Sequence, residues 1–151
     1  MNIADNQHLS PILWAVINGH TNIVKKILFI GTGDVNTISR EGETLLHISI
    51  RYGHLQIASD LIDTDGIEIN AQTEEYGFTP LHLACYYGHI GLASKLIIAG
   101  ANLTLRDRYD GKTALAYILD ETYKARLVEL NPNKESQSIE EVDVDIYTRA
   151  S

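Results

Sequence analysis

The chain has 151 residues, of which 44% are hydrophobic, and a formal net charge of −8. This length suits one domain with a core of its own and a short tail. The acidic balance argues against nucleic acid and anionic membrane as partners, because both are bound through basic surfaces.

One pattern occurs four times along the chain. Its first copy, SPILWAVINGHTNIVKKIL, begins at Ser10, and the later copies begin at Thr44, Thr79 and Thr113. The starting positions are 34, 35 and 34 residues apart. In the first three copies a Gly-His pair lies nine residues after the start, and apolar pairs follow in step. This register indicates a repeat architecture.

Each copy predicts two short helices joined by a tight turn. Thr44 and Thr79 occupy the position of a helix N-cap, and Pro80 follows at the first helical position. The glycine of the Gly-His pair ends the first helix, and apolar residues at i, i+1, i+4 and i+5 give the second helix one buried face. We expect Leu81 and Leu96 to be buried between repeats. A glycine-containing loop and a polar turn lead to the next copy.

The first and fourth copies depart most from the pattern. Leu13 stands in the first copy where the second and third have histidine. In the fourth copy Ala116 replaces that histidine, and Thr122 replaces the glycine. We predict that these two copies cap the stack. The fourth should form an irregular or extended helical pair that Pro132 ends.

The residues at the start of each copy identify a family. Thr79 to Ala84 reads T-P-L-H-L-A, Thr44 to Ser49 reads T-L-L-H-I-S, and Ser10 to Ala15 reads S-P-I-L-W-A. With the period, these residues resemble the ankyrin repeat. The resemblance covers about residues 5–130. It implies an all-α fold, an ankyrin-repeat solenoid of stacked helix-turn-helix units with β-turn fingers.

The resemblance also sets the expected domain organisation. We expect an ankyrin-repeat domain over 1–130, with repeats at about 5–36, 37–70, 71–104 and 105–130, and an acidic C-terminal tail over 131–151. In the tail Val142, Val144 and Ile146 alternate with acidic residues and a tyrosine. Two interpretations stay open: a largely disordered tail, or a segment that docks as an extended strand.

The histidines and the cysteine raise the question of catalysis or metal binding. The resemblance assigns His47 and His82 to hydrogen bonds that hold the turn. The other repeat histidines follow helix-ending glycines: His20, His54 and His89. A metal site would need several histidines within about 2 Å of one ion, whereas equivalent residues of neighbouring repeats lie about 8–10 Å apart. Cys85 takes a small core position, where we expect an inert thiol. We predict no enzymatic activity, no cofactor and no metal.

Function is then expected in the side chains that the repeat does not need. Ankyrin stacks usually bind protein on the concave face formed by the fingers and the first helices. In this register the displayed residues are Arg40, Glu41, Glu43, Arg51, Tyr52, Glu75, Tyr76, Phe78, Tyr86, Tyr87, Tyr109, Asp110 and Lys112. The first repeat displays only Asn6, Gln7, Ile17 and Asn18.

Aromatic residues dominate this displayed set. Five of the eight tyrosines and one of the two phenylalanines belong to it, and tyrosine and arginine are common in interface hot spots. One interpretation is an aromatic binding strip. The alternative is that some rings, especially Tyr52 and Phe78, pack over a neighbouring finger. Acidic neighbours, including Glu41, Glu74 and Glu75, favour a protein partner with basic residues at its rim.

The sequence therefore predicts a monomeric, non-catalytic protein-binding module that acts as an adaptor. The alternative is an inhibitor that occludes a partner's active or nucleic-acid-binding surface, with the acidic tail as a decoy, as in an effector of an intracellular pathogen or virus. The amino terminus, MNIADNQHLS, lacks the regions of a signal peptide. One cysteine excludes an internal disulfide. We expect a cytoplasmic protein, with the nucleus as the alternative.

Overall fold

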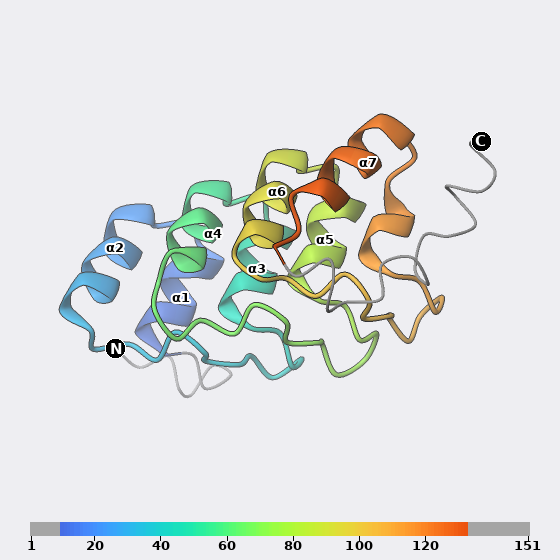
Figure 1. Ribbon diagram of the computed structural model, residues 1–151. Helices are drawn as coiled ribbons and strands as arrows, with labels where there is room; N and C mark the ends of the chain where they lie inside the picture. Colours follow the sequence, from blue (N-terminus) through green and yellow to red (C-terminus); the bar gives the residue numbers. More distant parts are fainter. Residues whose placement is uncertain (1–9, 133–151) are drawn as a thin grey trace.

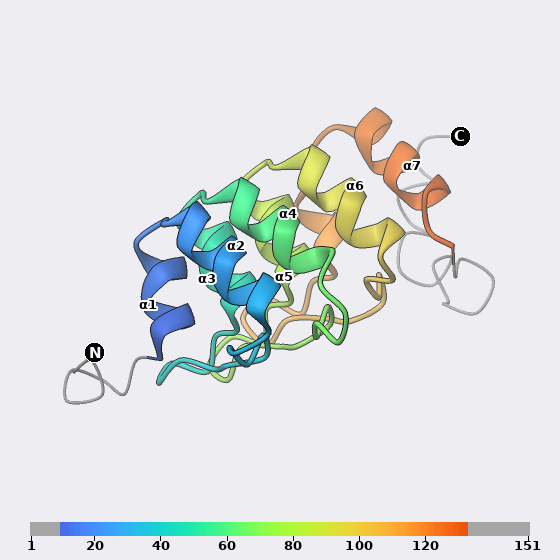
Figure 2. The same cartoon turned by 90° about the vertical axis from the view of Figure 1, so that its left-hand side faces the viewer.

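The computed structural model describes residues 10–132, which form a stack of helix pairs (Figure 1). The pairs are α1 (Pro11–Ile17) with α2 (Thr21–Ile30), α3 (Leu45–Arg51) with α4 (Leu55–Ile62), α5 (Pro80–Tyr86) with α6 (Ile90–Ile98), and the 3-10 helix η2 (Ala114–Tyr117) with α7 (Glu121–Glu129). Each pair packs on the next, so α1, α3, α5 and η2 form an inner row and α2, α4, α6 and α7 an outer row (Figure 2). The predicted all-α stack is confirmed.

The first helix of each unit begins where the sequence predicted. The hydroxyls of Ser10, Thr44 and Thr79 accept hydrogen bonds from the backbone N–H three residues on, which satisfies an otherwise unpaired donor at the helix start. Pro80 lies at the first helical position, where its missing N–H has no consequence. The N-caps predicted at Thr44 and Thr79 are therefore confirmed.

The turn between the paired helices depends on glycine. Gly19, Gly53 and Gly88 have φ angles of 72°, 76° and 78°, in the left-handed region that favours glycine. At Gly19 the turn also lies against the next repeat, because a Cβ there would be 2.7 Å from Cε1 of His54. The His54 ring reaches across the repeat boundary to the carbonyl of Ile17. The Gly-His pair thus shapes the turn and helps to stack it.

The core runs the length of the stack. Leu81 on α5 and Leu96 on α6 are 1% and 0% exposed, as predicted, and Leu46 and Leu61 of the preceding repeat are equally buried. Such a core joins each helix pair to the next and leaves no boundary along the stack free of apolar contacts.

Two asparagines connect successive loops on the outer side. The side chain of Asn36 donates to the carbonyl of Gly66 at 2.8 Å and accepts from the N–H of Glu68 at 2.9 Å. Asn70 repeats the arrangement one unit later, accepting from the N–H of Asn102 at 2.7 Å. These side chains satisfy backbone groups of loops that have no sheet to pair with.

The fourth unit is irregular, as its sequence predicted. Its first helix is the short 3-10 helix η2, and Thr113 makes no side-chain cap. No glycine is present to form the left-handed turn, and the chain instead passes through extended residues to Asp120, whose carboxylate caps α7. Helix α7 ends at Glu129, three residues before Pro132. Apart from its first two residues, the predicted tail lies outside the described part of the chain.

Within residues 10–132 no helix combines the length and the hydropathy that a bilayer crossing requires.

We predict that Leu81→Ala lowers the unfolding free energy by on the order of 2–5 kcal/mol, because a fully buried leucine leaves a cavity when it is truncated. Urea unfolding monitored by circular dichroism measures the loss. Ile98→Ala, on the exposed side of α6, is the matched control and should change stability by less than about 1 kcal/mol. Equal stabilities for wild type and Leu81→Ala would contradict the packing described above.

Candidate partner-binding groove

Three fingers project beside the inner helices, at residues 39–43, 73–78 and 107–112. Each is closed by a backbone hydrogen bond between its ends, of 2.8 Å in the first and 2.9 Å in the other two. Near each tip a glycine has a positive φ: Gly42, Gly77 and Gly111. The fingers therefore have a fixed backbone from which their side chains project.

Two buried histidines fix the fingers to the helices. Nδ1 of His47 lies 3.1 Å from the N–H of Thr44, which is always a donor, so this nitrogen is the acceptor. Nε2 then carries the proton and donates to the carbonyl of Phe78 at 2.7 Å. His82 makes the same contacts to Thr79 and to the carbonyl of Lys112 at 2.9 Å. The role that the family resemblance implied for these histidines is confirmed.

Burial is the main influence on both imidazoles. It lowers the pKa of His47 and of His82 below the ordinary value, although the carbonyl that each contacts acts in the opposite direction. His82 also has Asp107 at 4.0 Å from its Nε2, which favours the charged form without reversing the effect of burial. Both rings are therefore neutral links at neutral pH.

The last finger contains a buried carboxylate. One oxygen of Asp107 accepts from the N–H groups of Asp110, at 2.7 Å, and Gly111, at 3.0 Å, and the other accepts from the Tyr117 hydroxyl. Burial alone would raise the pKa of Asp107, but the hydrogen bond from Tyr117 and those from the backbone lower it. The pKa of Tyr117 is raised by burial and by the same carboxylate. This network joins the finger to η2.

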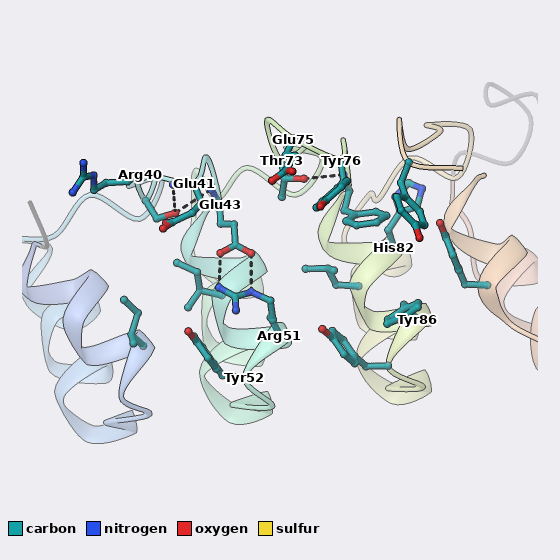
Figure 3. Close-up of a pocket in the computed structure, with 18 residues that line it drawn as sticks. Arg40, Glu41, Glu43, Arg51, Tyr52, Thr73, Glu75, Tyr76, His82 and Tyr86 are labelled. Atoms are coloured by element: carbon teal, nitrogen blue, oxygen red, sulfur yellow. Dashed lines mark hydrogen bonds and ion pairs between the residues drawn. The ribbon is translucent and has the colours of Figure 1, made fainter. Parts of the chain in front are cut away.

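A groove of about 900 Å³ lies between the fingers and the inner helices (Figure 3). Every residue predicted for the binding face lines it except Asp110 and Lys112, which pair with each other at its edge at 2.9 Å. Of the first-repeat residues, Ile17 lines the groove, Asn18 bonds to the carbonyl of Trp14, and Asn6 and Gln7 lie outside the described residues.

Several lining residues were not predicted from the sequence: Ser39, Ile48, Thr73, His82, Leu83 and Tyr117. Ile48, Leu83 and Tyr117 share one position, four residues after the helix-starting threonine. The repeat alignment contained this signal, because the fourth repeat has a tyrosine where the second and third repeats have an aliphatic residue. The position belongs to the apolar face of the first helix, which by itself favours the core rather than the groove.

Aromatic rings form a continuous series across the groove. Tyr109 contacts Tyr76, which contacts Phe78, at centroid distances of 5.6 and 5.7 Å. Phe78 contacts the buried His82, and the series continues through Tyr117 and Tyr86 to Tyr87. We call these seven rings the aromatic arc. It passes from the finger tips over the groove floor to the end of α5.

The arc is exposed at its ends and covered in the middle. Tyr86 and Tyr109 are 65% and 69% exposed, and Tyr76 and Tyr87 are also exposed. Phe78 is half-buried against the core. For Phe78 the packing alternative is therefore partly correct, whereas Tyr52 is exposed and lies under the guanidinium of Arg51.

The groove contains no arrangement of groups that suggests a reaction. Cys85 is buried, and burial raises the pKa of its thiol to about 12. No group of three or more His, Cys, Asp or Glu side chains among residues 10–132 is placed to hold a metal ion. Besides Glu43, which pairs with Arg51, the arrangement can offer ring faces, the carboxylates of Glu41 and Glu75, and hydrogen-bond donors to another molecule.

The comparisons identify the repeat. The family described as ankyrin repeats in three copies matches residues 12–107, which is well over half of the chain. The chain belongs to the ankyrin-repeat family. Ankyrin repeats are in general protein–protein interaction modules, and the three helix pairs within the matched residues are ankyrin units.

One curated relative of the ankyrin chain is an enzyme. A segment of 69 residues is 27% identical to a protein named NAD-dependent deacetylase sir2B from Dictyostelium discoideum. The match covers 46% of this chain but only 9% of that protein. So small a share of the relative gives no evidence of catalysis in this chain.

We predict that the protein loses stability as pH falls from about 7.5 to about 5.5, by on the order of 1 kcal/mol or more. The unfolded chain takes up protons near the ordinary histidine pKa of 6.5, whereas the folded pKa values of His47 and His82 are lower. Their stabilisation is therefore complete above that ordinary value and is lost as pH falls below it. Thermal midpoints at a series of pH values measure the effect.

The matched variants for this test are His82→Asn and His89→Asn. The pH dependence should weaken in His82→Asn and persist in His89→Asn, because His89 is half-buried at the start of α6 and makes no side-chain cap there. A stability that is flat over this range, or equally steep in His82→Asn, would contradict the assignment of neutral buried imidazoles.

We predict that Cys85 reacts with a thiol reagent more than about a hundredfold more slowly in the native protein than in denaturant, because a buried thiol with a raised pKa supplies little thiolate. Absorbance of the released chromophore measures both rates. Rapid labelling of the native protein would show that the core position of Cys85 is wrong.

Proposed function

We propose that this protein is a non-catalytic protein-binding module whose groove holds a segment of a partner protein. The observation that carries the proposal is the aromatic arc: its exposed tyrosines have no structural need to face solvent. The fold already has a complete core and closed fingers without them. Large rings with a polar tip, clustered in one hollow, are typical of protein interfaces.

The positions of the two ends of the arc favour a partner segment bound within the groove over a flat protein–protein contact. Tyr76 and Tyr109 project from fingers, whereas Tyr86 and Tyr87 lie at the end of α5 (Figure 3). A chain lying between them would be in contact with rings on two sides. Water would be excluded from the centre, where interface energy is usually concentrated.

The biological consequence of binding has two forms. An adaptor leaves its partner active, and a cytoplasmic adaptor is the form that we favour. The inhibitor alternative is supported by the groove carboxylates of Glu41 and Glu75, which pair with no lysine or arginine among the described residues. These would suit a partner's basic functional surface. An activity assay on a captured partner, with and without this protein, separates the two forms.

We predict that replacing Tyr86 and Tyr87 by alanine together weakens partner binding by about 2 kcal/mol or more. The thermal midpoint should change little, because exposed side chains lose little packing. Affinity capture from a cytosolic lysate, followed by titration of the captured protein, measures binding for each variant.

Lys26→Ala, on the exposed outer side of α2, is the matched control for this pair. It should retain both the partner and the stability of wild type. If the double tyrosine variant binds as well as the control, the groove is not the binding face.

A further inference from the structure

Two cations of this chain already lie in the groove region, each between a tyrosine ring and a carboxylate. The guanidinium of Arg51 lies 4.6 Å from the centroid of Tyr52 and donates to Glu43 at 2.8 Å (Figure 3). The hydrogen bond that Arg51 donates to Glu43 is the main reason that the pKa of Arg51 is raised. In the second repeat, the ring and the carboxylate are thus both in contact with a cation from the same repeat, Arg51.

The fourth repeat repeats this arrangement with lysine. The ammonium of Lys112 lies 5.3 Å from the centroid of Tyr117 and 2.9 Å from the Asp110 carboxylate. A cation is attracted electrostatically to the face of an aromatic ring. At both ends of the groove, a ring and a carboxylate therefore hold a positively charged side chain.

The third repeat also has tyrosine rings and a carboxylate at the groove, at other positions, but no lysine or arginine among the described residues is paired with them. Glu75 and Tyr76 are adjacent on its finger, and the Glu75 carboxylate is the main cause of the raised pKa of the Tyr76 hydroxyl. Tyr86 stands at the position that Arg51 has in the second repeat, so an aromatic ring replaces the internal cation. The groove residue Glu75 keeps its charge with no lysine or arginine paired to it within 10–132.

Nearby basic side chains are used elsewhere or do not reach. Arg108 donates to the backbone carbonyls of Thr73, at 2.7 Å, and Glu74, so its guanidinium holds the third finger in place. Arg40, on the neighbouring finger, lines the groove but forms no ion pair within the described residues. Neither residue neutralises Glu75.

We propose that the third repeat binds a basic side chain, preferably arginine, from the partner segment, over the exposed rings of Tyr76 and Tyr109 and against Glu75. The proposal rests on the proposed function of the groove and specifies its partner's chemistry. Arginine is favoured over lysine because its planar guanidinium stacks on rings and still offers donors to a carboxylate in the same plane. The partner's side chain would then supply to the third repeat the positive charge that Arg51 supplies in the second repeat and Lys112 in the fourth.

The test uses three small probes with the full chain: Nα-acetyl-arginine amide, Nα-acetyl-lysine amide, and the neutral isostere Nα-acetyl-citrulline amide. Titrations followed by the tyrosine ring signals in NMR spectra report both affinity and place. We expect shifts centred on Tyr76 and Tyr109, with citrulline at least about tenfold weaker than arginine, because only the charged probe has cation–π and ionic attraction. Lysine should lie between the two.

Paired variants separate the charge of Glu75 from the net charge of the protein. Glu75→Gln should weaken arginine binding several-fold, whereas Glu68→Gln, on an exposed loop away from the groove, should leave it unchanged. Equal binding of arginine and citrulline, an absence of shifts, or shifts centred on other tyrosines would overturn the proposal.

The two proposals fail in different ways. If the double variant of Tyr86 and Tyr87 loses its partner while the arginine probe causes no shift, the groove binds protein but not through a basic side chain. If the variant keeps its partner, the groove itself is not the interface, whatever the probe does.

Discussion

A buried imidazole connects each central repeat to the one that follows it. His47 and His82 accept a hydrogen bond from the helix-starting threonine through one nitrogen and donate to the next finger through the other. Both functions require the neutral ring in one tautomer, and burial ensures that state. Without this link the fingers that carry Phe78 and Lys112 would lose their hydrogen bond to the preceding inner helix, and the wall of the groove would be less firmly fixed.

Because the repeat is stabilised by few positions, most of the concave side is available for other purposes. The second repeat has an ion pair there, the third has five of the arc's seven rings, and the fourth has a lysine over a tyrosine. One backbone thus presents three different surfaces side by side. The differences between repeats, rather than their similarities, give the groove its chemistry.

The sequence predicted the fold well because the period places every helix start at a threonine or serine. It also predicted which tyrosines face the groove, since a residue just before a Gly-His pair or at a finger tip is exposed in any such stack. It did not predict Tyr117, because the same position in the second and third repeats holds the aliphatic residues Ile48 and Leu83. Nor did it predict the contact of Tyr117 with Asp107, because finger residues at that place, Ser39 and Thr73, act through small hydroxyls.

The irregular last unit has a consequence for the cooperativity of the whole groove. A linear stack opens first at its ends, and η2 lacks both the side-chain cap and the glycine turn of the earlier units. Yet its finger and its 3-10 helix supply Tyr109 and Tyr117, so one wall of the groove belongs to the segment with the least local support. Any segment bound across that wall would be in contact with the third and fourth units together. Its binding energy would then oppose fraying of the terminal unit, and recognition would be thermodynamically linked to the folding of that end of the molecule.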